Sequence, residues 1–179
     1  MTTTARPSSL ALALLWGLVA PLAAQTWTQV ADSGGYPNYP NGPNLAAMAY
    51  DGARDEVEAL DSFNSGSRTW TWNGSAWTQR FPDPNLSGTG RDVRGQMVFD
   101  AQRGRVVLFG GRTGAGLLDD TWTWNGSKWT QLSPVGGVHP SARRGGAMVY
   151  LGNGRILLHG GLDAGEPNNV GLNDTWILD

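Results

Sequence analysis

The side chains best suited to bind a ligand in this sequence are arginines, tyrosines, a histidine and a phenylalanine in polar, Gly- and Pro-rich stretches. They are Tyr36, Tyr39, Phe81, Arg91, Arg94, Arg112, His139, Arg143 and Arg144. Arg offers a planar, bidentate set of donors for carboxylates or sugar hydroxyls, and Tyr supplies rigid, amphipathic contact area. The set predicts a binding surface for a protein or a glycan. The alternative is that the arginines cap strand ends or bridge neighbouring sheets.

Between these stretches lie short segments rich in Val, Leu, Phe, Trp and Thr, which pack well on a half-buried pleated surface. In the clearest run, 94–132, the strand candidates are residues 95–100, 105–110, 120–125 and 128–132. Asn125-Gly126 suits a tight hairpin because both positions accept positive φ. The run predicts a four-stranded antiparallel meander. Long loops, where binding residues concentrate, are expected between strands two and three and after strand four, on one face.

Imperfect copies of this unit lie on both sides of it. Met48, Met97 and Met148 stand 49 and 51 positions apart. A period near 50 with four strands per unit is typical of propeller blades, which must pack on their neighbours to bury two apolar faces. The residues expected to carry this repeat packing are Gly110, Gly111, Gly160, Gly161, Trp72, Trp77, Trp124, Trp129 and Trp176.

Two units end their second strand in a diglycine, within the segments RVVLFGG and RILLHGG. Aromatic third-strand segments follow, DDTWTWN and NDTWIL, and the central unit continues into the Trp-led KWTQL. In this pattern the chain resembles the kelch repeat family, whose members fold as β-propellers. The first unit departs from it, with Asp61-Ser62 in place of the diglycine. The predicted fold class is all-β: about three four-stranded antiparallel blades of the kelch type, forming a partial or half propeller.

The repeats divide the chain after residue 24 into four parts. A lone fourth strand and loop occupy 25–43, blades occupy 44–80 and 93–132, and a blade lacking its fourth strand occupies 145–179. Three blades are fewer than the four to eight usual for a closed ring. In kelch-type propellers, strands from the two termini commonly complete one blade together. Either two chains therefore join head to tail into a six-bladed ring, or the chain is a fragment of a larger kelch protein without independent function.

The propeller resemblance also implies two enzyme classes as alternatives, sialidases and copper oxidases. A sialidase-type site needs an arginine triad and a tyrosine nucleophile; Arg91, Arg112, Arg143 and Tyr36 are the right types, but no spacing supports the grouping. A galactose-oxidase-type site uses a cysteine cross-linked to tyrosine, and the sequence has no cysteine. His139 has no placed acid to complete a triad. The prediction is a non-enzymatic binding module with no catalytic residue, cofactor or metal site.

The first 24 residues have the features of an export signal peptide. Arg6 is the only charged side chain there, residues 10–19 form a short apolar run, and small residues precede Gln25. The run is shorter than the roughly 20 apolar residues that span a membrane. We expect cleavage after residue 24 and a secreted, periplasmic or extracellular protein that does not associate with the membrane once the signal is removed.

With a net charge of −2, the sequence is not basic enough to suggest a nucleic-acid partner, whose backbone requires a clustered basic surface. The tryptophans invite a carbohydrate-platform hypothesis, but most recur at repeat positions, which favours packing between blades. His159, which replaces Phe109 of the central unit inside an apolar strand, is interpreted as a core residue.

Overall fold

The computed structural model describes residues 27–30, 45–63, 66–82, 86, 91–92, 94–132, 137–164 and 170–179. The predicted signal peptide, Tyr36 and Tyr39 lie outside the described residues. Within them almost all regular structure is β, apart from one residue of 3-10 helix at Leu86. None of the described residues form a helix with the length and apolar character needed to cross a membrane.

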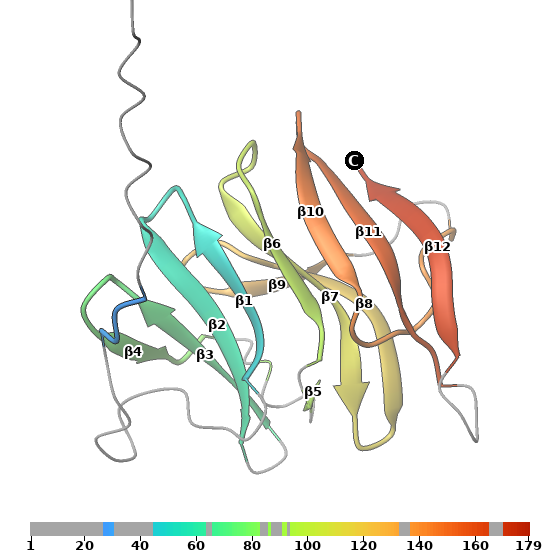
Figure 1. Cartoon of the computed structure of the whole chain (residues 1–179), viewed down its shortest axis with the longest axis horizontal. Coiled ribbons are helices and arrows are strands. Elements are labelled where there is room, and N and C mark those ends of the chain that lie inside the picture. Colours follow the sequence, from blue (N-terminus) through green and yellow to red (C-terminus); the bar gives the residue numbers. More distant parts are fainter. Residues whose placement is uncertain are drawn as a thin grey trace, which may run out of the picture.

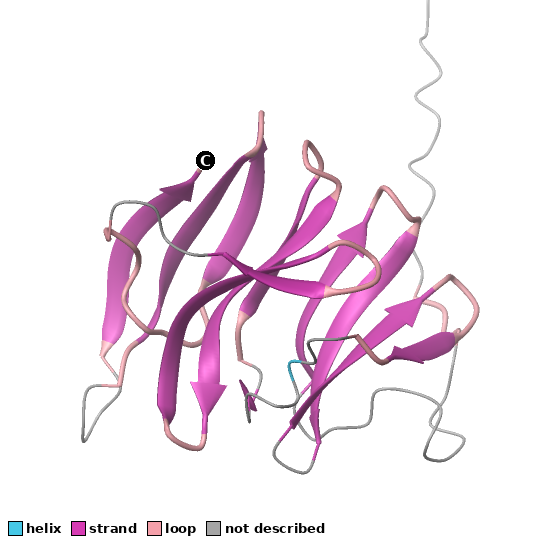
Figure 2. Cartoon of the chain, turned by 180° about the vertical axis from the view of Figure 1, so that it is seen from behind, coloured by secondary structure: helices cyan, strands magenta, loops and turns pink. Residues whose placement is uncertain are grey.

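Three antiparallel sheets stand side by side in chain order (Figures 1 and 2). Sheet 1 contains β1 (Leu45–Asp51), β2 (Glu56–Phe63), β3 (Gly66–Trp72) and β4 (Trp77–Arg80). Sheet 2 contains β6 (Gln96–Asp100), β7 (Arg105–Thr113), β8 (Gly116–Trp124) and β9 (Trp129–Leu132), and the two-residue β5 (Arg91–Asp92) also pairs with β7. Sheet 3 contains only β10 (Ala147–Gly152), β11 (Arg155–Leu162) and β12 (Gly171–Leu178). The predicted all-β class with antiparallel meanders is confirmed.

The sheets share one register, so each residue of one sheet has a counterpart in the others. On the first strand, the pairs Met48–Ala59, Met97–Leu108 and Met148–Leu158 are equivalent. On the third strand, the equivalent pairs are Trp72–Val57, Trp124–Val106 and Leu178–Ile156. The spacing of the methionines in the sequence therefore corresponds to one structural position in each sheet.

The connections between second and third strands differ from expectation in sheets 1 and 2. The segment 110–119, expected as a long loop, extends both strands instead, and Thr113 pairs with Gly116 across a tight turn. In sheet 1, Phe63 likewise pairs with Gly66. Gly111 pairs with Leu118 and Arg112 with Leu117, so the pairing continues past the diglycine.

The first junction, between sheets 1 and 2, is a closed hydrophobic core. Its buried members are Leu60, Leu86, Val106, Leu108, Trp122, Trp124 and Trp129. The second junction, between sheets 2 and 3, uses the opposite face of sheet 2, because successive residues of a strand point to opposite faces. Val107 and Phe109 of β7 lie there opposite Ile156 and Leu158 of β11. Sheet 2 is therefore covered on both faces.

The outer face of sheet 3 has no neighbour among the described residues. Val149 and Ile177 are exposed on this face. His159 is exposed too, with Nδ1 3.0 Å from the Thr175 hydroxyl oxygen. The interpretation of His159 as a core residue is therefore wrong. Its counterpart Phe109 is buried because sheet 3 covers it, whereas no described residue covers sheet 3 in the same way.

The diglycines allow a neighbouring loop to pass close to β7. Gly110 and Gly111 have φ of 63° and 110°, in the region that favours glycine. A Cβ on Gly110 would lie 2.6 Å from the backbone oxygen of Arg143, in the loop that leads to sheet 3. In sheet 1, Asp61 stands at the corresponding place, and β2 pairs with β3 without the register shift found in sheets 2 and 3. The pair of β2 and β3 in sheet 1 is therefore a regular hairpin.

Candidate functional site

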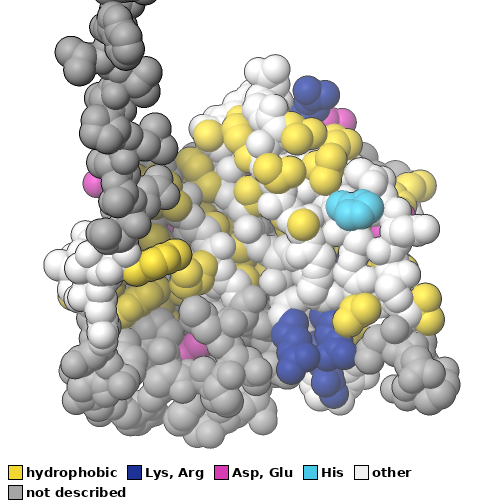
Figure 3. All heavy atoms as spheres, viewed as in Figure 1, with side chains coloured by type: hydrophobic (Ala, Val, Ile, Leu, Met, Phe, Trp, Pro, Cys, Tyr) yellow, Lys and Arg dark blue, Asp and Glu magenta, His cyan; other side chains and the backbone are white. Residues whose placement is uncertain are grey.

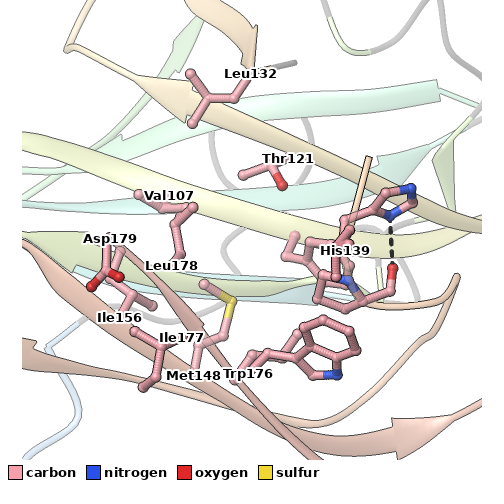
Figure 4. A pocket seen from close by; sticks show the side chains of 14 residues that line it. Val107, Thr121, Leu132, His139, Met148, Ile156, Trp176, Ile177, Leu178 and Asp179 are labelled. Atoms are coloured by element: carbon pink, nitrogen blue, oxygen red, sulfur yellow. Dashed lines mark hydrogen bonds between the residues drawn. The ribbon is translucent and has the colours of Figure 1, made fainter. Parts of the chain in front are cut away.

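A cavity with a volume of about 450 Å³ lies in the second junction (Figure 4). Val107, Thr121 and Leu132 of sheet 2 line one side of it. Sheet 3 lines the other side, with Met148, Ile156, Trp176, Leu178 and Asp179. Most of this lining is apolar, so the cavity suits a hydrophobic or aromatic group better than a charged one.

His139 lies at this cavity with two polar neighbours. Its Nδ1 is 3.0 Å from the carbonyl oxygen of Pro140, a contact drawn in Figure 4. The same nitrogen is 3.9 Å from a carboxylate oxygen of Asp119, which is half exposed. With a proton on Nδ1 the ring donates to Pro140, and Nε2 is then an acceptor. This arrangement can orient a polar group of a ligand.

Arg143 is fully buried, unlike the surface residue expected from the sequence. Its guanidinium donates to both carboxylate oxygens of Asp174, at 2.5 and 2.8 Å, and to the carbonyl of Gly160 at 3.0 Å. It also donates to the hydroxyl and carbonyl oxygens of Ser141, both at 3.0 Å. The hydrogen bonds from Arg143, together with one from the Trp176 indole, hold the pKa of Asp174 well below its usual range.

The backbone of Arg143 joins sheet 2 to sheet 3. Its N–H donates to the carbonyl of Leu118 at 3.0 Å, and its carbonyl accepts from the N–H of Gly111 at 2.9 Å. Side chain and backbone together attach β7 and β8 to β11 and β12. Arg143 therefore follows the structural alternative, in which an arginine bridges neighbouring sheets. An arginine triad of the sialidase type would lack this member.

Three other predicted arginines lie near one another on the rim at the lower end of sheets 2 and 3. Arg94 lies two residues before β6 and Arg144 three residues before β10, and the Arg94 carbonyl accepts from the N–H of Gly145 at 2.9 Å. Arg112 lies near the end of β7, where Asp92 pairs with it. Figure 3 shows Lys and Arg side chains gathered on the surface below β6 and β10. Arg94, Arg112 and Arg144 are called the arginine rim below.

The remaining predicted site residues do not join this rim in the described structure. Phe81 is exposed directly after β4, at the end of sheet 1. Arg91 lies in β5, where its backbone pairs with Thr113 of β7. The Arg91 side chain lies outside the described part. The predicted surface therefore separates into the arginine rim, the cavity beside His139 and the buried Arg143.

Glu58 is a notable residue that the sequence reasoning did not select. It is fully buried in the first junction, and neither carboxyl oxygen has a hydrogen-bond partner among the described residues. Burial raises the pKa of Glu58 to about 8, an effect that the neighbouring Trp124 indole opposes. Its counterparts, Val107 and Leu157, are apolar. Aligning the repeats by strand pairing would have revealed this acid.

Two arginines in tight turns were also missed, and each links one sheet to the next. Arg103 donates to a carboxylate oxygen of Asp100 at 3.0 Å and to the carbonyl of Gly154 in sheet 3 at 2.7 Å. Arg54 bonds Asp51 in the same way and reaches the carbonyl of Gly104 in sheet 2. The signal was in the sequence, as Asp-x-x-Arg at 51–54 and 100–103.

Among the residues that the structure describes, no three His, Cys, Asp or Glu side chains are grouped to hold a metal ion. The geometry instead offers an apolar cavity at one junction and an exposed basic rim. No protein-family model and no curated protein matches the sequence.

Proposed function

We propose that the chain is an exported, kelch-type propeller segment that acts as a binding module for a protein or glycan with acidic groups. The arginine rim carries this proposal. Strand ends from two sheets bring Arg94 and Arg144 together although they are 50 positions apart in the sequence. The sheets make a rigid support, and loops on a rigid scaffold commonly carry binding residues.

Charge supports an acidic ligand. The chain has a formal net charge of −2, so a local group of arginines stands out against an acidic background. Guanidinium groups bind carboxylates through paired hydrogen bonds, which gives orientation as well as affinity. Arg94 and Arg112 are exposed and therefore available to a ligand.

The kelch-type assignment rests on features internal to the chain. The diglycines at 110–111 and 160–161 adopt the same pair of positive φ values, 63° and 110° against 67° and 111°. The indole nitrogens of Trp122 and Trp176 each donate to an aspartate two residues earlier, at 2.7 Å in both cases. This agreement supports genuine repeats of one blade-like unit.

The experiment is a binding measurement with two defined probes, a uronic-acid oligosaccharide and a poly-glutamate peptide. The double variant Arg94→Ala/Arg112→Ala is expected to lose at least about tenfold in affinity, equivalent to roughly 1.4 kcal/mol, without a change in melting temperature. Arg155→Ala is the matched control, because Arg155 is exposed but begins β11 away from the rim. Equal binding by all three proteins would contradict the proposal, as would turnover of glycosidase substrates with or without added metals.

A further inference from the structure

The segment Trp27–Val30 has the sequence of a fourth strand but forms no strand in the structure. It reads WTQV, whereas β4 reads WTQR and β9 reads WTQL. All four of its residues are exposed, and Trp27 is fully so. A large aromatic side chain left in water is costly, so this segment is a candidate to pair with an open sheet edge.

The number of residues between Trp27–Val30 and sheet 1 indicates where the sheet that this segment would complete lies relative to sheet 1. The segment between β4 and β6, residues 81–95, has 15 residues, and that between β9 and β10, residues 133–146, has 14. Between Val30 and β1 there are again 14 residues, 31–44. Trp27–Val30 is therefore spaced as the fourth strand of a sheet that precedes sheet 1 and packs against it.

The second junction has a cavity where a fourth-strand tryptophan would lie. In the first junction, Trp129 is fully buried, its ring lies 5.3 Å from that of Trp124, and its Nε1 donates to the Thr69 hydroxyl at 2.9 Å. The counterparts of Thr69 and Trp124 are Thr121 and Leu178. Both line the cavity of about 450 Å³ (Figure 4). A cavity of about 150 Å³ already holds a benzene ring, so an indole fits.

We propose that Trp27–Val30 of a second copy of this chain pairs antiparallel with β12 and places Trp27 in the cavity of the second junction. By the register of sheets 1 and 2, Trp27 lies opposite Leu178 and Val30 opposite Thr175. The Trp27 indole donates to the Thr121 hydroxyl, as Trp129 donates to Thr69. This contact is independent of any ligand on the arginine rim.

The outer faces of sheets 1 and 3 indicate a second copy rather than the same chain. Met48 and Tyr50 are exposed on sheet 1, although Ala59 and Trp70 of the same face are buried, and Val149 and Ile177 are exposed on sheet 3. At each existing junction, the same two kinds of face meet, one equivalent to the outer face of sheet 1 and one equivalent to the outer face of sheet 3. Met97 and Met148, the counterparts of Met48, lie at the first and the second junction. Figure 3 shows apolar side chains on the surface over β10 and β11.

The short segment between Val30 and β1, residues 31–44, also indicates a second copy. Because this segment is short, the sheet 1 of the chain that donates Trp27–Val30 must pack against the sheet 3 that the donated strand completes. Within one chain, sheet 2 separates these two sheets (Figures 1 and 2). Two copies that exchange strands reciprocally bring together six sheets of described residues, within the four to eight of closed propellers, and the head-to-tail contact closes with two-fold symmetry.

Cross-linking tests this pairing directly, because the chain has no cysteine of its own. Single variants Thr28→Cys and Ile177→Cys are mixed and treated with a short bifunctional thiol reagent. In the proposed register these residues are directly opposite, so a covalent dimer is the expected main product. Thr28→Cys mixed with Asn173→Cys, four positions along β12, is the register control and should link at least about fivefold less. If one chain completes its own sheet, the mixture gives no dimer, and the double variant links internally.

Sedimentation of the full chain provides the second measurement. The wild type is expected at the mass of two copies, and Trp27→Ala is expected to weaken association by at least about tenfold. Phe81→Ala is the matched control, because it removes an exposed aromatic residue outside the proposed contact. A folded monomer unaffected by Trp27→Ala would overturn the proposal, and so would open-ended aggregation of wild type and variant alike.

Discussion

The two junctions of this molecule use the same positions but are filled differently. In the first, Trp129 and Leu86 are fully buried between the sheets. In the second there is no described fourth strand, a cavity lies in its place, and Val138, 52 positions after Leu86, is 77% exposed. The comparison indicates that one tryptophan from the fourth strand and one apolar residue from the following loop seal a junction.

In the second junction, where no described tryptophan of a fourth strand is packed, polar contacts hold the two sheets together. Arg143 connects four strands through hydrogen bonds of its side chain and backbone, and Arg103 adds a bond to Gly154. Hydrogen bonds of this kind fix geometry but contribute less than the burial of a large aromatic side chain. These contacts therefore hold sheets 2 and 3 in a defined orientation, although the space between the two sheets is not fully packed.

The largest expected effect is on the first junction. Trp129→Ala should lower the free energy of unfolding by about 3–5 kcal/mol, since it creates a cavity and removes the partner of Thr69. Trp27→Ala, the same change in the exposed segment, should stay within about 0.5 kcal/mol at concentrations where the chain is monomeric. Urea denaturation measures both. Equal midpoints for Trp129→Ala and wild type would show that the first junction does not depend on this side chain.

A second prediction concerns the polar bridge. Arg143→Ala should cost about 2–4 kcal/mol, because it leaves the Gly160 carbonyl and the Asp174 carboxylate without their main donor. Thermal unfolding measures the change, and Arg155→Ala, at an exposed arginine of β11, is the control. A melting temperature like that of the wild type would mean that the second junction is held by contacts other than Arg143.

The loop residues give a direct comparison of the two junctions. Leu86→Ala should cost about 2–3 kcal/mol as a buried large-to-small change. Val138→Ala should cost less than about 0.5 kcal/mol in the monomer, as an exposed substitution does. The difference should shrink under conditions where copies associate, because Val138 would then be covered. Equal costs in the monomer would remove the distinction between sealed and open junctions.

Glu58 makes the first junction sensitive to pH. Its pKa is raised to about 8 in the folded chain, so the folded state binds a proton that the unfolded state releases above its own, ordinary carboxyl pKa. Stability should therefore fall as pH rises from about 4.5 to 8 and then level off. Glu58→Gln should flatten this fall and be more stable than wild type at pH 8.5 by about 1–3 kcal/mol. Parallel pH profiles for the two proteins would contradict this account.

Much of the fold was predictable because the same types of side chain recur at equivalent positions of each repeat. Strand alternation, the Asn125-Gly126 turn and the spacing of the methionines all carry that information locally. The extension of β7 and β8 beyond the diglycine was not predicted, because a Gly-rich segment is equally compatible with a loop and a hairpin.

The candidate site was less predictable, since exposure depends on the neighbouring sheet. Arg143 and Arg144 are adjacent in sequence, yet the first is fully buried and the second is only partly so. Phe109 and His159 are counterparts, and among the described residues a sheet packs over Phe109 but not over His159. Glu58 was overlooked because its burial becomes apparent only when the strand register aligns it with Val107 and Leu157.

Amide hydrogen exchange of residues 27–30 and of β12 tests the central claim most directly, that the second junction is completed by a strand from another copy. The account predicts slow exchange at Thr28 and Val30 and along β12 at high protein concentration, and faster exchange on dilution or in Trp27→Ala. Fast exchange at Thr28 and Val30 at every concentration would contradict it.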